Sequence, residues 1–359
     1  MAISKKEMNL DPLLRNRRDF PDNAEDQAEH LWWNVNADLV ERLWANDGGV
    51  RTALRSEYLG KVASFFSEGA VNNATIIELG SGSGWVGRYL VQGSNNNLLG
   101  IDLSEAQVTL AKNNADAANL DRQCKYICAN ISDSVKHINE DQIITGLLIH
   151  AILHHLTKSE IDQLLINVVN LAPQAKFFAY EPVFFPNIRG ENNTGFISRA
   201  SKILAVTSAL SILILMRIYG RVISASRDKD FLDRVDKVSR DAIKNQWVFS
   251  PKEIVFDQEV FLATLGKSFN VKRTYCCNYL DIEAATMAAI LFDKSHGKWM
   301  YIKFFIPVLR LLDKWLVASG SIYELCNGKN NSKLISLFFP KFCFWGVECI
   351  PLSKSPQDR

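Results

Sequence analysis

The stretch Ile76-Ile77-Glu78-Leu79-Gly80-Ser81-Gly82-Ser83-Gly84-Trp85 decides the fold of this chain. Two β-branched residues lead into a carboxylate, and a glycine-rich turn separates them from what reads as the start of a helix. Glycines let a backbone approach a ligand closely, and the N-terminus of a helix favours electron-rich groups. The stretch therefore predicts a strand, a ligand-binding turn and a helix, the unit that holds a nucleotide-like cofactor.

A second carboxylate follows at a distance that matters for nucleotide binding. Residues 98–102 read as a short strand that ends in Asp102, about 20 residues beyond the glycine turn, where an acid reaches a ribose diol. Ser104 then caps a further helix. The spacing Gly82-x-Gly84-x-x-Gly87 also fits the dinucleotide motif, which is a weak signal alone. Glu78 counts against that motif, because a dinucleotide fold usually carries an apolar residue there.

Strands and helices alternate along the middle of the chain. The predicted strands are residues 75–79, 98–102, 125–129, 143–149 and 176–180. Alternation of this kind indicates a parallel sheet with helices on both faces, and ligands of such sheets bind at the carboxyl ends of the strands. We therefore expect an α/β, doubly wound, Rossmann-like core. Two further strands are predicted at 271–280 and 342–351.

Several motifs, taken in order, resemble those of the class I S-adenosylmethionine-dependent methyltransferases. They are Glu78 to Gly84, Gly100 to Ser104, Tyr126 to Ile131, Leu153-His154-His155-Leu156 and Ala179 to Pro182. The resemblance covers about residues 74–182 and resumes at 250–280. It implies a seven-stranded sheet whose last strand is antiparallel to the one before it, and S-adenosyl-L-methionine as cofactor.

The resemblance also implies roles for single residues. The cofactor-binding residues that it implies are Glu78, Gly80, Gly82, Gly84, Asp102, Leu103, Asn130 and Ile131. The glycines would contact the methionine part and Glu78 would support their turn. Asp102 would accept hydrogen bonds from the ribose and Leu103 would pack on the adenine. Asn130 and Ile131 would meet the adenine edge. The family usually has Asp where Asn130 stands, yet an amide oxygen can still accept from an exocyclic amine. The alternative for each residue is a plain structural turn or strand end.

Three histidines are the catalytic candidates. A sulfonium methyl group is already activated, so catalysis needs alignment and exclusion of water, and a hydroxyl acceptor also needs a general base. Histidine has the most suitable unperturbed pKa for that task. His150, His154 and His155 lie just past the fourth predicted strand. His150 is the first candidate because it directly follows the strand, while the alternative is that all three only cap and pack. Glu181 could orient a base or bind substrate, although Pro182 after it favours a turn.

The rest of the chain divides around this core. The expected parts are an N-terminal helical lid or platform (1–70), the cofactor-binding core (71–182), a helical insert (183–249), a continuation of the core (250–282), a second helical insert (283–340) and a final strand with its tail (341–359). The sequence Ser250-Pro251-Lys252-Glu253 predicts a helix start. Residues 203–216 carry no charge, but they are fewer than the about 20 that a membrane span needs. They predict a buried helix, a homodimer contact or an interfacial segment.

Composition limits the partners. The net charge is only +2 with 22% charged residues, so no nucleic-acid partner is expected. The seven cysteines are scattered and form no metal-ligand framework, so no metal is expected. No apolar stretch follows the first residues, so we expect no signal peptide and a cytoplasmic enzyme, with peripheral membrane contact left open.

Three hypotheses follow. The leading one is a methyltransferase that acts on a small or lipid-like apolar acceptor, most plausibly at oxygen. The second is a non-catalytic binding or scaffold protein built on the same fold, because fold does not fix function. The third is an NAD(P)-dependent oxidoreductase, which Glu78 and the Leu-His-His-Leu segment disfavour.

Overall fold

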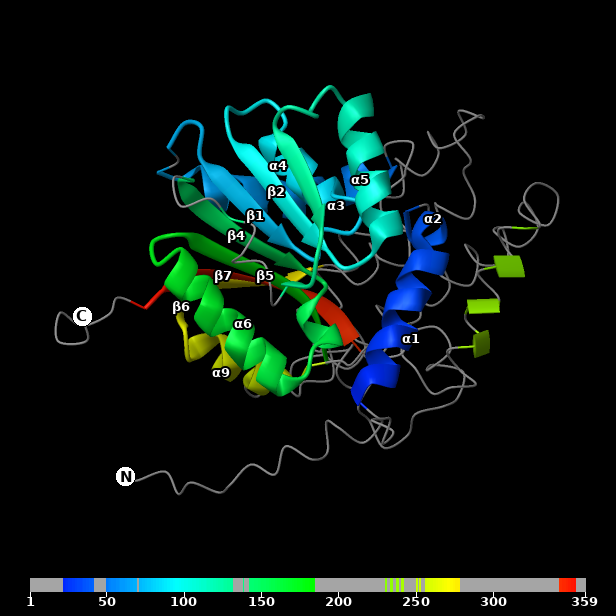
Figure 1. Ribbon diagram of the computed structural model, residues 1–359. Helices are drawn as coiled ribbons and strands as arrows, with labels where there is room; N and C mark the ends of the chain where they lie inside the picture. Colours follow the sequence, from blue (N-terminus) through cyan, green and yellow to red (C-terminus); the bar gives the residue numbers. More distant parts are fainter. Residues whose placement is uncertain are drawn as a thin grey trace, which may run out of the picture.

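The computed structural model describes residues 22–41, 50–69, 71–131, 138, 142–184, 230, 233–234, 237–238, 240–241, 250, 252, 256–277 and 342–352. Within them, seven strands form one mixed sheet in the order β3-β2-β1-β4-β5-β7-β6 (Figure 1). The strands are β1 Thr75–Leu79, β2 Asn97–Asp102, β3 Cys124–Cys128, β4 Ile144–His150, β5 Lys176–Phe184, β6 Phe269–Cys277 and β7 Phe342–Pro351.

The helices cover both faces of this sheet. They are α1 Asp22–Val35, α2 Ala37–Val40, α3 Val50–Ser67, α4 Trp85–Val91, α5 Glu105–Ala117, α6 Lys158–Leu171 and α9 Gln258–Gly266, with a short 3₁₀ turn, η4 Leu153–His155. In Figure 1, α6 and α9 lie together on one side of the sheet, and α3 and α4 lie on the other. This arrangement is the doubly wound α/β core that the sequence predicts.

The strand order places a switch point between β1 and β4. Strands β1 to β5 are parallel to one another, and β1 pairs with β2 on one side and with β4 on the other. In open sheets of this kind, ligands bind at the carboxyl ends of the strands beside such a point. Strand β7 enters between β5 and β6 and is antiparallel to both, which confirms the expected direction of the last strand.

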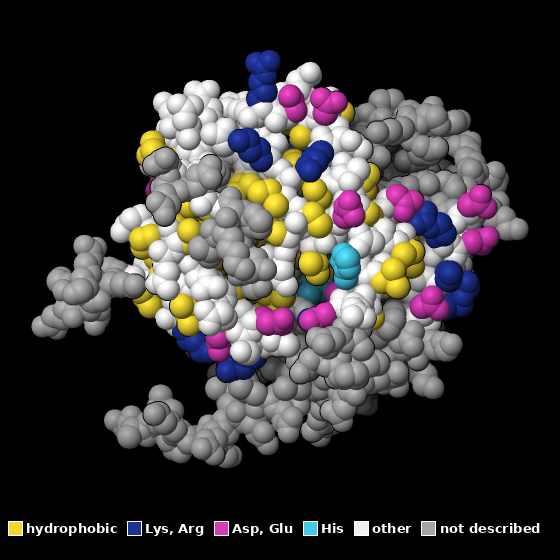
Figure 2. Space-filling model, in the orientation of Figure 1, with side chains coloured by type: hydrophobic (Ala, Val, Ile, Leu, Met, Phe, Trp, Pro, Cys, Tyr) yellow, Lys and Arg dark blue, Asp and Glu magenta, His cyan; other side chains and the backbone are white. Residues whose placement is uncertain are grey.

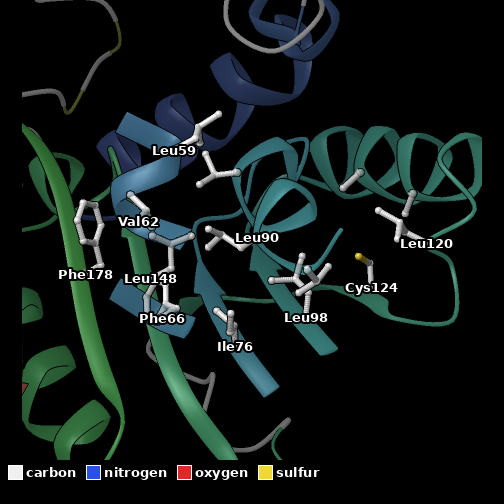
Figure 3. Close-up of a cluster of buried hydrophobic side chains, with 14 of the residues drawn as sticks. Leu59, Val62, Phe66, Ile76, Leu90, Leu98, Leu120, Cys124, Leu148 and Phe178 are labelled. Carbon is white, nitrogen blue, oxygen red and sulfur yellow. The ribbon is translucent and has the colours of Figure 1, made fainter. Parts of the chain in front are cut away.

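One hydrophobic core joins the sheet to α3, α4 and α5. Its members from α3 include Leu59, Val62 and Phe66, and those from the sheet include Ile76, Leu98, Leu148 and Phe178. Figure 3 shows these side chains directed toward one another between the helices and the strands. Burial of a large apolar side chain contributes about 1.5–3 kcal/mol to the free energy of unfolding. This cluster therefore holds the strands rigidly, and with them the loops at their carboxyl ends.

Strand β5 extends beyond its predicted end, and the turn expected at Pro182 is wrong. Pro182 lies within β5, which continues to Phe184 and pairs with β7 there. Pairing with β4 ends at Tyr180, so the missing N–H of Pro182 interrupts no bond to that strand. Strand β6 begins two residues earlier than predicted, at Phe269.

The predicted helix start at Ser250 is also wrong. The helix begins at Gln258, where the side chain of Asp257 accepts hydrogen bonds from the N–H groups of Glu259 and Val260. The N–H of Lys252, which a Ser250 cap would have to accept, donates to the Glu29 carboxylate instead. The helix ends at Gly266 as predicted.

Several expectations fall on residues outside the described ranges. They include the uncharged run 203–216, the whole of the second insert (283–340) and the end of the helix predicted to begin at Ala37, of which α2 is the described part. Among the described helices, none is long and apolar enough to cross a membrane.

Candidate functional site

The glycine turn between β1 and α4 has a backbone conformation that is unfavourable for residues with a Cβ. Gly80, Gly82 and Gly84 have φ of 68°, 51° and 69°, in the left-handed region. A Cβ at Gly80 would lie 1.9 Å from the Ile152 side chain, and one at Gly84 would lie 2.4 Å from the Tyr126 hydroxyl. At Gly82 the nearest atom would be 3.8 Å away. Two of the glycines are therefore required by close packing, whereas at Gly82 only the positive φ favours glycine, since a Cβ there would make an ordinary contact.

Asp102 joins this turn to the next helix. Its Oδ2 accepts a hydrogen bond from the N–H of Gly82 at 2.7 Å, and its Oδ1 accepts one from the N–H of Ser104 at 2.9 Å. Burial raises the pKa of Asp102, and these two N–H groups oppose that shift. Each carboxylate oxygen still has a second lone pair, so the group can accept further hydrogen bonds.

Glu78 lies beneath the turn with no compensating hydrogen bond at one oxygen. The residue is 1% exposed, and its Oε2 has no hydrogen-bond partner among the described residues. Burial raises the pKa of Glu78 to about 8, against the opposing charge of Arg88. The hydroxyl of Ser81 is likewise buried without a partner in this part of the chain. Buried polar groups are usually paired, so both atoms are candidates for contact with a ligand.

The predicted adenine residues lie along the next two strand ends. Leu103 follows β2 and is 44% exposed, and Asn130 and Ile131 follow β3, which pairs with β2. Cys128 Sγ approaches the Leu103 carbonyl at 3.4 Å, so the two strand ends are adjacent. The structure thus brings Glu78, the glycine turn, Asp102 and these three residues to one edge of the sheet.

His150 belongs to a group of rings that we call the aromatic cluster: Tyr58, Trp85, His150 and Tyr180. The His150 ring stacks on Tyr180 with 4.5 Å between centroids and an angle of 10°, and the Trp85 ring meets it edge-on at 5.3 Å. Tyr58 lies 4.6 Å from Tyr180. Parallel pairing aligns Leu79 with Ile149, so His150 stands beside the first glycine of the turn. Except for Tyr58, these rings are only partly buried.

His154 is held elsewhere, by Glu181. Its Nδ1 lies 2.6 Å from Glu181 Oε2, and a carboxylate can only accept, so the imidazole donates. Glu181 Oε1 also accepts from the N–H groups of Ile152 and Leu153, at 3.0 and 2.8 Å. Between β4 and this turn, Ala151 adopts φ of 58°, a strained conformation for a residue with a Cβ. Glu181 therefore fixes η4, and with it the Ile152 side chain that packs on Gly80.

His155 pairs with a carboxylate from α1. Its Nδ1 lies 2.8 Å from Glu29 Oε1, and the rings of His154 and His155 are 4.0 Å apart. The pKa of Glu29 is lowered to about 2, because hydrogen bonds and the charge of His155 outweigh the opposing effect of burial. The three histidines thus occupy two environments. His150 sits among aromatic rings beside the glycine turn, and the other two are buried in carboxylate pairs.

Helix α1 also contacts the first turn of α5. Asn34 Oδ1 accepts from the Ser104 hydroxyl at 2.9 Å and from the N–H of Ala106 at 3.1 Å. Sequence reasoning missed Glu29 and Asn34, because the partners Ser104 and His155 lie 70 residues or more away along the chain. The spacing of Glu29 and Trp33 by one helical turn was visible, but it reveals only their mutual hydrogen bond.

The surface is mixed in charge on the side that Figure 2 shows, where basic and acidic side chains of the described residues alternate. No group of three or more His, Cys, Asp or Glu side chains in the described ranges is arranged to hold a metal ion.

An adenosyl cofactor fits the residues that are present. The backbone of the turn is least crowded at Gly82, where an added Cβ would meet nothing closer than 3.8 Å. A carboxylate at the end of β2 stands where a diol would need acceptors, and the buried Oε2 of Glu78 lacks a partner among the described residues. A cationic amino group near Glu78 would supply that partner.

The family comparison agrees with this arrangement. Residues 76–173 match the family model described as a methyltransferase domain. These residues run from β1 to just beyond α6 and so include the glycine turn, Asp102 and η4. Among curated proteins, no sequence matches this chain.

Solved structures with a similar fold share little sequence with the chain. Geranyl diphosphate C-methyltransferase from Streptomyces coelicolor A3(2), with Mg²⁺, geranyl diphosphate and S-adenosyl-L-homocysteine, is 9% identical with a TM-score of 0.42, over 82% of this chain and 80% of that one. The [4+2]-cyclase SpnF is 11% identical with a TM-score of 0.46, over 89% and 94%. The cyclopropane synthase MmaA2 from Mycobacterium tuberculosis is 13% identical with a TM-score of 0.43, over 81% and 82%. Likenesses this slight say nothing of substrate.

Proposed function

We propose that this chain, whose residues 76–173 form the methyltransferase domain of a class I S-adenosylmethionine-dependent enzyme, methylates an oxygen of a small or lipid-like apolar acceptor. The observation that carries the proposal is the hydrogen bond between Gly82 and Asp102, which shapes a cofactor turn directly beside the aromatic cluster. S-adenosylmethionine supplies an activated sulfonium methyl group when bound. The protein has to bind it, align the acceptor and exclude water.

The aromatic cluster supports an apolar acceptor. Trp85 directly follows the glycine turn, and its ring meets His150, which stacks on Tyr180. Partly exposed rings present large apolar faces at low conformational cost, with polar atoms only at their edges. An acceptor that packs on them would displace water from the edge of the sheet where the sulfonium methyl is expected. The uncharged run 203–216 of the sequence is the reason to propose peripheral membrane contact as well.

His150 is the histidine that we propose as general base for a hydroxyl acceptor. It is partly exposed and its ring plane is fixed by Tyr180, so a nitrogen can be presented in a constant direction. His154 and His155 are buried, whereas His150 is partly exposed, and the Nδ1 atoms of the two buried rings meet Glu181 and Glu29. Their proposed role is to hold η4 in place beside the glycine turn.

The first test is calorimetric titration with S-adenosylmethionine and with NAD. We expect binding of the sulfonium cofactor and none of NAD. Methyl transfer is then measured with labelled cofactor and a panel of apolar alcohols, phenols, amines and thiols. Product at oxygen supports the proposal. Cofactor binding without transfer to any member of the panel favours the scaffold hypothesis, and binding of NAD alone favours the oxidoreductase.

The role of His150 has its own test. His150→Gln should lower kcat by about 10²- to 10⁴-fold, the usual contribution of a general base, with little change in cofactor affinity. Arg122→Gln is the control, because Arg122 is exposed and lies shortly before β3, at the amino ends of the strands. A rate for His150→Gln within a few-fold of the wild type would remove His150 from the reaction without touching the cofactor assignment. Membrane contact is tested separately, by flotation with vesicles that contain anionic lipid.

A further inference from the structure

Helix α1 spans the edge of the sheet where the proposed cofactor site lies. At one end, Asn34 accepts two hydrogen bonds from the start of α5, directly after Asp102 and Leu103. About a turn and a half earlier, Glu29 contacts η4, which follows β4. The two contacts therefore stand on opposite sides of the glycine turn. Figure 1 shows α1 running between α5 and the segment that holds η4.

The Glu29 contact is unusually dense. We use the name Glu29 cluster for Glu29 with Trp33, His155, Ser250 and Lys252. Oε1 accepts from the Trp33 indole at 2.7 Å and the Ser250 hydroxyl at 2.8 Å, and it lies 2.8 Å from His155 Nδ1. Oε2 accepts from the N–H of Lys252 at 2.9 Å. One carboxylate thus ties α1 to η4 and to the segment that precedes α9.

Burial makes these contacts depend on one another. Glu29 is 7% exposed, His155 9% and Ser250 0%. The Trp33 ring also meets the His155 ring edge-on at 5.5 Å. Removing one partner of a buried charged pair leaves the other without compensation, whereas lifting α1 as a whole exposes all members to water together. The cluster therefore favours two arrangements of α1, fully seated or fully released.

We propose that Glu29 is a positioning residue of the methyl-transfer site, which seats α1 over the cofactor and fixes η4, so that cofactor exchange requires release of the Glu29 cluster. The proposal rests on the proposed function, because it takes the cofactor to lie between Asp102 and η4. Through η4 the same carboxylate acts on the glycine turn, since Ile152 packs against Gly80.

The chain offers a matched control on the same helix. Asp26 is also an acidic residue of α1 and also contacts Lys252, through the lysine ammonium. The Asp26 side chain is 54% exposed, against 9% for Lys252, and it takes part in none of the hydrogen bonds of the Glu29 carboxylate. Asp26→Asn and Glu29→Gln each remove one negative charge from α1, yet only the second disrupts the buried cluster.

The main experiment is stopped-flow binding of S-adenosylmethionine to the full chain. If release of the Glu29 cluster precedes binding, the observed rate for the wild type should level off as the cofactor concentration rises. Glu29→Gln should raise that limiting rate, and the rate of cofactor dissociation, by about tenfold or more, the effect of losing a charge-assisted hydrogen bond. Asp26→Asn should stay within about twofold of the wild type. A wild-type rate that rises linearly to the highest concentration, with equal rates for both variants, would overturn the proposal.

Hydrogen exchange on the ligand-free protein tests the positioning role independently. Amides in residues 22–35 and 152–156 should exchange faster in Glu29→Gln than in Asp26→Asn, with β1, β4 and β5 unchanged. If Glu29→Gln does not fold, Asn34→Ala releases the other anchor and should speed exchange in residues 22–35 alone. Equal protection of α1 in all variants would contradict the proposal. If the variants show these differences in exchange but the wild type binds no S-adenosylmethionine, the proposed function is refuted and the seating of α1 by Glu29 is established.

Discussion

The backbone N–H of Gly82 donates to the Asp102 carboxylate at 2.7 Å, although the two residues stand 20 positions apart in the chain. The second oxygen of the same carboxylate accepts from Ser104, at the start of α5. One side chain therefore fixes the middle of the glycine turn and the entry to the next helix. The turn is shaped before any ligand arrives, so less ordering remains to be done on binding.

This double contact predicts a graded response at Asp102. Asp102→Asn keeps one oxygen as an acceptor but turns an NH₂ group toward the other N–H, and Asp102→Ala removes both acceptors. We expect affinity for S-adenosylmethionine to fall by about tenfold or more in Asp102→Asn and further in Asp102→Ala, with the protein still folded. Calorimetric titration together with thermal unfolding measures both effects. Asp116→Asn, an exposed change on α5, is the control, and affinities equal to it would refute the cofactor role.

Substitution by alanine should have opposite effects at Gly84, in the glycine turn, and at Gly60, in α3. Gly84 has φ of 69°, and an added Cβ would lie 2.4 Å from the Tyr126 hydroxyl, so Gly84→Ala should lower the melting temperature by several degrees. Gly60 lies inside α3 with nothing within 4 Å of the added Cβ. Gly60→Ala should leave the melting temperature unchanged or raise it slightly, because alanine favours helix. Thermal unfolding followed by circular dichroism compares the two, and equal shifts would contradict the strain argument.

The backbone conformation of Ala151 predicts that its replacement by glycine does not destabilise the protein and can stabilise it. It adopts φ of 58° between β4 and η4, where its N–H donates to the Tyr180 carbonyl. Glycine takes this conformation without a steric penalty, so Ala151→Gly should match or raise the free energy of unfolding by up to about 1 kcal/mol. Ala111→Gly in α5 should lower it, because that alanine is buried in a regular helix. Chemical denaturation measures the free energy of unfolding of both variants. An equal decrease for Ala151→Gly and Ala111→Gly would contradict the conclusion that Ala151 is strained.

The core was open to prediction because its signals are local. Strands β1 and β7 have the predicted bounds, and the glycine turn with Asp102 follows from spacing alone. Hydrophobic runs and glycines act over a few residues, so they can be interpreted without knowledge of the fold. The same locality misled at Ser250, where the pattern of a helix cap is present but the N–H of Lys252 donates to Glu29, 223 residues away.

The cofactor-binding residues of the candidate site could be predicted from the sequence, but the environments of its histidines could not. The cofactor residues stand at strand ends, and strand ends of a parallel sheet meet at one edge. The two environments of the histidines were not predictable, because the position of the His150 ring depends on stacking with Tyr180 and that of His154 on its hydrogen bond to Glu181. Both partners lie on β5, where successive side chains point to opposite faces. Such pairing depends on register, which no local pattern of one strand reveals.

Glu78 predicts a decline of stability with rising pH. Burial raises its pKa from 4.5 to about 8 in the folded protein. Between these values the unfolded chain has lost the proton and the folded chain has kept it, so the free energy of unfolding falls as pH rises from 4.5 to 8 and levels off above it. Glu78→Gln should lack this part of the decline and be the more stable form at pH 8. Chemical denaturation across this pH range, with the exposed Glu105→Gln as control, would show parallel curves if Glu78 does not titrate in this way.

The same carboxyl group predicts that cofactor binding releases a proton. At pH 7 a group whose pKa is about 8 is mostly protonated. The ammonium group of the cofactor, placed near Glu78 Oε2, would favour the ionised form and lower that pKa, so up to about one proton should leave on binding. Titration calorimetry in buffers of different ionisation enthalpy measures this number as the slope of the observed enthalpy. The slope should vanish in Glu78→Gln and persist in Glu105→Gln. A wild type that binds the cofactor with zero slope would mean that the ammonium group does not meet Glu78.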